Sequence, residues 1–151
     1  MARGDRIIAV SDQIAELINE RYGTQVGDKV LRSAAQVLQS CVRGSDLVAR
    51  FSGEEFMIVL PGADRDVAKQ VAQRMLNALA AADHDSETGN VKITASIGIA
   101  TYTPKQRFPS TLALLEAADH SLYAAKLCGR NRFECYEDLS ETARPPATAR
   151  R

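Results

Sequence analysis

A short hairpin-like segment constrains the fold of this chain more than any other feature. Two strand-like runs, Leu47–Phe51 and Phe56–Leu60, are separated by only four residues. β-branched and aromatic residues favour strands, and Gly53 supplies the backbone freedom that a tight turn needs. The segment therefore predicts an antiparallel hairpin. Its tip carries two adjacent carboxylates, a pair suited to a divalent cation: Glu54 and Glu55.

Hydrophobic periodicity places further elements on both sides of this hairpin. The expected helices are Asp12–Tyr22, Val26–Val42, Asp64–Ala82 and Thr111–Leu127, and the other expected strands are Arg6–Val10, Val91–Thr101 and Arg132–Tyr136. The order βααββαβαβ predicts an α+β fold, with helices packed on a mixed sheet that contains the hairpin at its centre. We expect one domain over residues 1–138. Residues 139–151, rich in small residues, Pro and Arg, are expected to form a disordered tail.

Composition fits one globular domain and argues against several classes of protein. The 151 residues are 45% hydrophobic, enough for one sizeable core. Acidic and basic residues balance at 19 each, which argues against DNA, RNA or anionic lipid as partners. No apolar run approaches the ~20 residues of a membrane span, and we expect a cytoplasmic location. The cysteines lack metal-ligand spacing and are expected to be reduced thiols in or beside the core: Cys41, Cys128 and Cys135.

Four ordered motifs, spread over roughly residues 7–133, resemble those of one known family. They are Arg50–Phe56 (RFSGEEF), Asn19–Asp28 (NERYGTQVGD), Ala95–Ala100 (ASIGIA) and Ala117–Asn131 (AADHSLYAAKLCGRN). Together they are similar to the GGDEF family of bacterial diguanylate cyclases, with Ser52 replacing the first glycine of the signature loop. The resemblance implies a ferredoxin-like core of the nucleotidyl cyclase and polymerase palm type. Because members normally begin with an additional helix, the chain is either N-terminally truncated or lacks a wall of its substrate pocket.

The resemblance assigns roles to the residues at the hairpin tip. Glu54 would be a metal ligand, and Glu55 would assist deprotonation of the attacking 3′-hydroxyl of GTP. The backbone of Ser52 and Gly53 would approach the phosphates. Phosphoryl transfer of this kind uses divalent cations to hold the triphosphate. We therefore expect Mg²⁺ or Mn²⁺ when a nucleoside triphosphate binds, and no cofactor otherwise.

Residues outside the hairpin complete the implied nucleotide site. Asn19 and Asp28 fall where the family recognises guanine, and an amide with a carboxylate suits the O6, N1 and N2 edge of that base. Lys126 and Arg130, at the end of the last helix, match the family's phosphate-contacting residues. The alternative for each of these pairs is a solvated surface position without a ligand.

Two departures from the family pattern weaken the implied metal site. The family's first metal-binding Asp falls on Ser11, and its lysine falls on Glu16, which reverses a charge near the triphosphate. A hydroxyl cannot replace the lost charge, and even an outer-shell change typically costs ~10 to 100-fold. The remaining metal contacts would come from Glu54, the backbone of Asp12 and the position of Ser11; the Asp12 side chain substitutes only if the strand end shifts register. These changes indicate a weak or inactive cyclase.

An R-x-x-D sequence, Arg43 to Asp46, precedes the hairpin, where many family members place an inhibitory site for cyclic di-GMP. Arg43 can present its fork to guanine O6 and N7, and Asp46 can accept hydrogen bonds from N1–H and N2–H. Arg74 on the third helix resembles a second arginine that some members use there. The alternatives are a helix-terminal arginine with a strand-leading aspartate, and an ordinary surface arginine.

Three functional hypotheses follow. The leading one is a cyclic di-GMP signalling domain that is weak or inactive as a cyclase and binds cyclic di-GMP through Arg43, Asp46 and Arg74. The second is an active diguanylate cyclase that converts two GTP molecules to cyclic di-GMP and two pyrophosphates. The third is a protein-interaction module with a relic nucleotide site. The expected partners are cyclic di-GMP, GTP, a second copy in a homodimer or ligand-bridged dimer, and an upstream sensor or dimerisation domain.

Overall fold

A computed structural model describes residues 6–10, 24–52, 55–84, 89–103 and 107–139. Its helices are α2 (Thr24–Ser40), α3 (Arg65–Ala81), α4 (Thr111–Leu127) and the 3-10 helix η1 (Tyr136–Asp138), and its strands are β1 (Arg6–Val10), β2 (Leu47–Ser52), β3 (Glu55–Val59), β4 (Ile97–Thr101) and β5 (Phe133–Cys135). The predicted α+β class is confirmed. The expected helix Asp12–Tyr22 and the expected tail lie outside the described residues.

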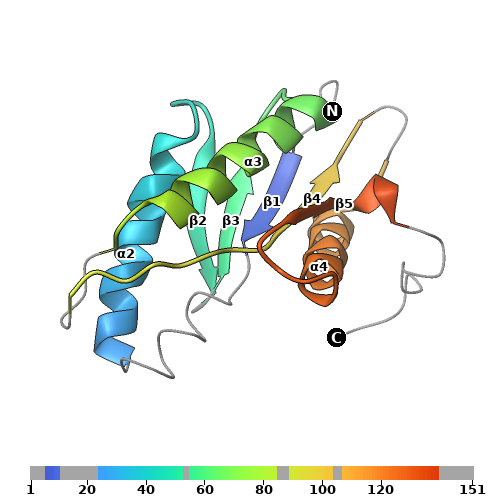
Figure 1. Cartoon of the computed structure of the whole chain (residues 1–151). Coiled ribbons are helices and arrows are strands. Elements are labelled where there is room, and N and C mark those ends of the chain that lie inside the picture. The colour runs from blue at the N-terminus through green and yellow to red at the C-terminus, as the bar shows by residue number, and fades with distance from the viewer. Residues whose placement is uncertain (1–5, 11–23, 53–54, 85–88, 104–106, 140–151) are drawn as a thin grey trace.

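The strands form one sheet in the order β2-β3-β1-β4-β5. The first four strands pair antiparallel, and β5 joins β4 in parallel. The predicted hairpin is present, but it lies at one edge of the sheet and not at its centre, because β1 takes the central place between β3 and β4. Arg50 pairs with Phe56, and the register shifts between Arg50 and Ser52. A register shift of this kind bends a hairpin locally and re-aims the side chains at its tip. In Figure 1, α2 and α3 run along one side of the sheet.

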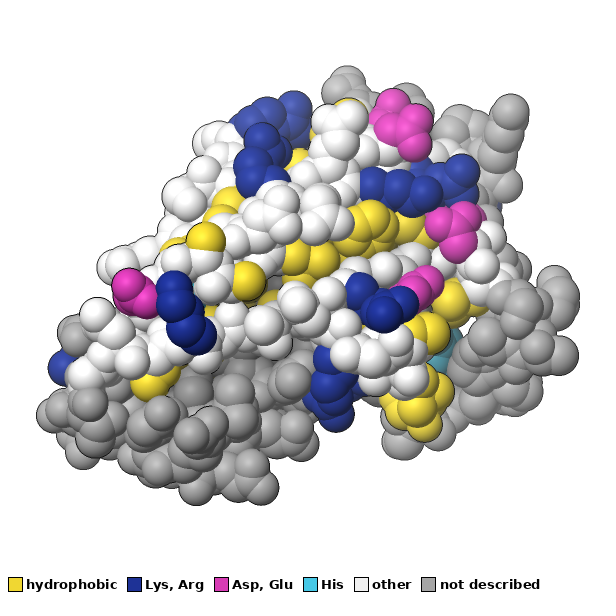
Figure 2. All heavy atoms as spheres, viewed as in Figure 1, with side chains coloured by type: hydrophobic (Ala, Val, Ile, Leu, Met, Phe, Trp, Pro, Cys, Tyr) yellow, Lys and Arg dark blue, Asp and Glu magenta, His cyan; other side chains and the backbone are white. Residues whose placement is uncertain are grey.

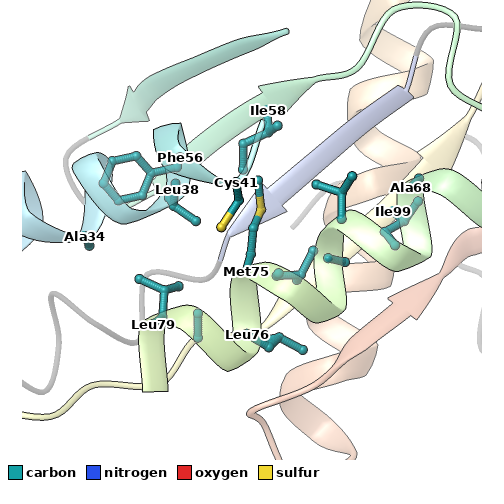
Figure 3. Close-up of a cluster of buried hydrophobic side chains, with 14 of the residues drawn as sticks. Ala34, Leu38, Cys41, Phe56, Ile58, Ala68, Met75, Leu76, Leu79 and Ile99 are labelled. Carbon is teal, nitrogen blue, oxygen red and sulfur yellow. The ribbon is translucent and has the colours of Figure 1, made fainter. Parts of the chain in front are cut away.

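Strand alternation sends side chains into two apolar layers, one on each face of the sheet. In β3, Phe56 and Ile58 are buried against α2 and α3, whereas Met57 and Val59 pack on the side that carries α4. Figure 3 shows the first layer, where Leu38 of α2 and Met75 of α3 approach these β3 side chains. The sheet is thus covered on both faces, which explains why all of β4 is buried.

The backbones of β4 and α4 approach each other closely at Gly98. A Cβ atom added at Gly98 would come within 2.2 Å of the Ala118 carbonyl oxygen and 2.3 Å of the Leu122 backbone nitrogen. Only glycine permits this spacing. Gly98 therefore lets α4 dock directly on the sheet, and this docking fixes the position of the helix end that carries Lys126.

A buried histidine links α2 to the end of α3. The side chain of His84 is fully buried; its Nδ1 lies 2.8 Å from the Ser33 hydroxyl oxygen and its Nε2 lies 3.1 Å from the Leu79 carbonyl oxygen. Because a carbonyl only accepts, Nε2 carries a proton, and in the neutral ring Nδ1 accepts from Ser33. Both ring nitrogens are satisfied, so His84 reads as a structural residue that joins the two helices.

Several sequence-predicted boundaries differ from the structure. The run Val91–Thr101 forms a strand only over Ile97–Thr101, because the five residues of β1 pair with that stretch alone. Val91 instead makes an isolated bridge with His84. Cys41 and Cys135 are buried free thiols as expected, but Cys128 is exposed just beyond α4. Among the described residues, no helix is long and apolar enough to cross a bilayer.

Candidate functional site

The structure describes part of the sequence-predicted site. Outside the described residues lie Ser11, Asp12, Asn19, Gly53 and Glu54, so their predicted roles stay predictions. For Ser52 only the strand backbone is described. Glu55 opens β3 and is half-buried. Since neighbouring side chains of a strand point to opposite faces, Glu55 lies on the face opposite to buried Phe56.

Asp28 lies near the start of α2 and pairs with Arg50 of β2. Arg50 Nη2 and Asp28 Oδ1 are 3.6 Å apart, and the two side chains are 43% and 48% exposed. Arg50 can reach this helix because its register partner Phe56 is buried under α2 and α3, and directly opposed residues share a face of the sheet. Sequence reasoning gave Arg50 no role, although it opens the loop motif.

The end of α4 carries the two basic residues expected to contact phosphate, Lys126 and Arg130. The helix ends in a Schellman motif, in which the Arg130 N–H donates to the Ala125 carbonyl oxygen at 2.9 Å and the Gly129 N–H donates to the Lys126 carbonyl oxygen at 3.3 Å. Gly129 takes φ 118°, a value that glycine adopts easily. Arg130 follows at φ 64° and Asn131 at φ 51°. Non-glycine residues in this region carry backbone strain, which clusters at functional sites.

These residues gather at one end of the sheet. In Figure 1 the start of α2, the joined ends of β2 and β3, and the end of α4 all lie toward the lower edge of the view. Asp28 belongs to the first turns of α2, Glu55 opens β3, and Lys126 and Arg130 lie at and just beyond the end of α4. Asp28 comes from α2, on the face that buries Phe56, whereas Glu55 lies on the opposite face, against which α4 packs. The described part of the chain holds no group of three or more His, Cys, Asp or Glu side chains that could bind a metal.

The R-x-x-D turn lies at the other end of β2, because that strand runs from Leu47 to Ser52. Arg43 surrounds the Asp46 carboxylate: its backbone N–H and Nε donate to Oδ2 at 2.9 and 3.3 Å, and its Nη2 donates to Oδ1 at 3.0 Å. The same Nη2 donates to the Pro61 carbonyl oxygen at 3.2 Å. The hydrogen bond and the negative charge of Asp46 raise the pKa of Arg43.

Exposure differs sharply between these two partners. The Arg43 side chain is 62% exposed, whereas that of Asp46 is 2% exposed. The sequence-based prediction was that both side chains hydrogen-bond directly to a guanine edge. For that to happen, the Arg43 guanidinium must first move off the Asp46 carboxylate. Arg74 is exposed on α3. Figure 2 shows basic side chains interspersed with acidic ones on the face that carries α3, in keeping with the balanced net charge.

Comparison with known proteins gives a consistent result. The family described as diguanylate cyclase, GGDEF domain, matches residues 13–132. The chain is 36% identical over 132 residues to diguanylate cyclase DgcP of Pseudomonas aeruginosa, which covers 87% of the chain and 19% of that protein. It is 32% identical over 126 residues to diguanylate cyclase A of Treponema denticola, covering 83% of the chain and 33% of that protein. The chain thus spans a third or less of the length of these relatives.

Solved structures show the same fold. The GGDEF domain of DgcB from Caulobacter crescentus, in complex with c-di-GMP, superposes with a TM-score of 0.80 at 26% identity, covering 89% of this chain and 79% of that one. The active GGEEF domain of a diguanylate cyclase from Vibrio cholerae superposes with a TM-score of 0.79 at 27% identity, covering 91% and 85%. With its signature hairpin, its sheet and these matches in agreement, the chain belongs to the GGDEF family of diguanylate cyclase domains.

Proposed function

We propose that this domain is a cyclic di-GMP receptor with weak or no cyclase activity, and that it binds its ligand at the turn formed by Arg43 and Asp46. The observation that carries this proposal is the geometry of the turn. An exposed guanidinium covers a buried carboxylate at the surface. The two groups together offer the donors and the acceptor that recognise a guanine edge.

Binding at this turn requires an exchange of hydrogen bonds. Arg43 leaves the carboxylate of Asp46 and turns its fork toward guanine O6 and N7. N1–H and N2–H of the base then replace the two guanidinium hydrogen bonds, while the Arg43 backbone N–H stays on Asp46. The carboxylate keeps its full set of donors, which matters because a buried acceptor without a partner costs about 1–3 kcal/mol.

The case for weak catalysis rests on the substitutions at Ser11 and Glu16. The Vibrio cholerae relative is described as an active GGEEF domain, so a Glu at position 54 does not by itself abolish activity. Oxygen ligands such as Glu54 and the backbone of Asp12 suit Mg²⁺, which would hold the triphosphate. The carboxylate missing at position 11 lowers the charge available to hold that ion.

An active cyclase is the second candidate. It is favoured by one observation, that the start of α2, the joined ends of β2 and β3 and the end of α4, which carry Asp28, Glu55, Lys126 and Arg130, lie toward the same edge of the view in Figure 1. Incubation with GTP and Mg²⁺ or Mn²⁺ decides between the two. The receptor proposal expects little or no cyclic di-GMP. Ordinary cyclase turnover that is lost in Glu55→Gln would overturn the claim of impaired catalysis.

Titration calorimetry with cyclic di-GMP tests the receptor proposal itself. We expect Arg43→Ala to weaken binding by roughly tenfold or more, since an arginine fork on a guanine edge contributes ~1–3 kcal/mol. Arg32→Ala is the matched control, because Arg32 is an exposed arginine of the preceding helix and is not part of the Arg43–Asp46 turn. Equal affinity of wild type and Arg43→Ala would remove the proposed site.

A further inference from the structure

We infer that Arg50 is a positioning residue for Asp28 and thereby contributes to selection of guanine over adenine at the nucleotide end of the sheet. This inference rests on the proposed role of Asp28 in guanine recognition. It starts from the ion pair between the two side chains, which joins α2 to the hairpin strand β2. Arg50 touches the carboxylate and not the reacting atoms.

The sheet register fixes where the Arg50 guanidinium emerges. Arg50 is opposed to Phe56, immediately before the register shift that bends the hairpin. Phe56 is 2% exposed, and its burial under α2 and α3 anchors the strand backbone at this point. The guanidinium thus extends from a rigid strand to the start of α2, where Asp28 lies in the first turns of the helix.

The pair contributes little to stability. Both side chains are nearly half exposed, and ion pairs of this kind are worth ~0–1 kcal/mol. Its effect is to restrict the carboxylate. An arginine that holds one oxygen of Asp28 leaves the other oxygen, Oδ2, for N–H donors, and guanine presents N1–H and N2–H where adenine has no such pair. Orientation of this carboxylate therefore decides how well the two bases are distinguished.

The test is the ratio of the dissociation constants for ATP and GTP, measured by calorimetry on the intact chain. We expect wild type to prefer GTP and Asp28→Ala to lose roughly tenfold of that preference. Arg50→Ala should lose a comparable part of it, and Arg50→Lys, which keeps the charge, should lose less. Arg65→Ala, which removes a partly exposed arginine that pairs with Asp138 instead, should leave the ratio unchanged.

The double variant Asp28→Ala/Arg50→Ala separates positioning from direct contact. If Arg50 acts through Asp28, the double variant discriminates no worse than Asp28→Ala alone. Additive losses, or an unchanged ratio in Arg50→Ala with a lowered one in Asp28→Ala, would overturn the role of Arg50 while leaving guanine recognition intact. A wild-type protein without preference for GTP would instead overturn guanine recognition by Asp28, and the inference with it.

Discussion

At the residue scale, the pairing of Arg43 with Asp46 decides how the proposed ligand site works. The carboxylate is held by one backbone and two guanidinium hydrogen bonds, and its partner is mostly exposed. Such an arrangement stabilises the turn and, in our proposal, also forms the ligand site. Its two residues should therefore respond differently to mutation.

We predict that Asp46→Ala destabilises the fold by about 1–3 kcal/mol, because it removes the acceptor for the Arg43 backbone N–H. Arg43→Ala should lower the free energy of unfolding by less, since water reaches the carboxylate that the arginine covered. Asp46→Asn retains an acceptor, so its loss of unfolding free energy should lie between those of Arg43→Ala and Asp46→Ala. Denaturant unfolding of the three variants checks this order, and a larger loss in Arg43→Ala than in Asp46→Ala would contradict it.

The Cys135 thiol gives a pH-dependent prediction. Burial raises its pKa from 9.0 to about 12. Between these values the unfolded chain loses the thiol proton and the folded chain keeps it, so stability should fall as pH rises from 9 toward 12. Unfolding free energies of wild type and Cys135→Ala, measured across this range, should differ by an amount that changes with pH. A constant difference would show that the thiol does not titrate in this way.

At the scale of elements, the end of α4 combines a good helix stop with strained residues. Gly129 closes the Schellman motif, and two non-glycine residues follow in the left-handed region. The sequence indicates the stop through its glycine, and asparagine at position 131 is compatible with the left-handed region, but the left-handed conformation of Arg130 has no sequence signal. Strain at a position that we expect to contact phosphate fits a trade between stability and function.

We predict that Arg130→Gly stabilises the domain by about 0.5–1 kcal/mol, because relief of ~1–2 kcal/mol of left-handed strain exceeds the entropic cost of glycine. The same variant should bind GTP more weakly. Asn131→Gly is the control: asparagine tolerates this conformation, so stability and GTP affinity should both change little. Thermal unfolding together with GTP titration measures both effects. A destabilised Arg130→Gly variant would contradict the strain argument.

At Gly98, where α4 docks on β4, we predict that replacing glycine destabilises the fold, whereas introducing glycine at position 130 stabilises it. Gly98→Ala should destabilise the fold by roughly 3 kcal/mol, because its Cβ would meet backbone atoms of α4 that cannot yield without moving the helix. Ala100→Gly on the same strand is a milder comparison that creates space instead of a clash. Chemical denaturation gives the free energies of unfolding of the two variants and the wild type. A Gly98→Ala variant as stable as wild type would show that α4 can shift on the sheet.

At the scale of the whole molecule, the sequence predicts the α+β class and most of the described elements, but not the place of the hairpin at the edge of the sheet. Turn residues and hydrophobic period predicted the hairpin and three helices that the structure describes, because these signals are local. The end of the strand before Ile97 was missed, since a strand ends where its partner ends and β1 is distant in sequence. The burial of Asp46 and the Asp28–Arg50 pair depend on how separate elements meet, so no local pattern predicts them.

The two ends of the sheet have different proposed roles. The hairpin tip gathers the residues expected to bind a nucleoside triphosphate, and the R-x-x-D turn lies at the far end of β2. The central claim is that cyclic di-GMP binds at the second end.

The most direct test is a titration with cyclic di-GMP followed by backbone amide chemical shifts of the ¹⁵N-labelled chain. The largest shift changes should centre on residues 43–46 and on the Pro61 turn that Arg43 contacts. The start of α2 and the end of α4 should change little. Changes centred on Asp28, Glu55 and Lys126 instead, or none at saturating ligand, would contradict the account.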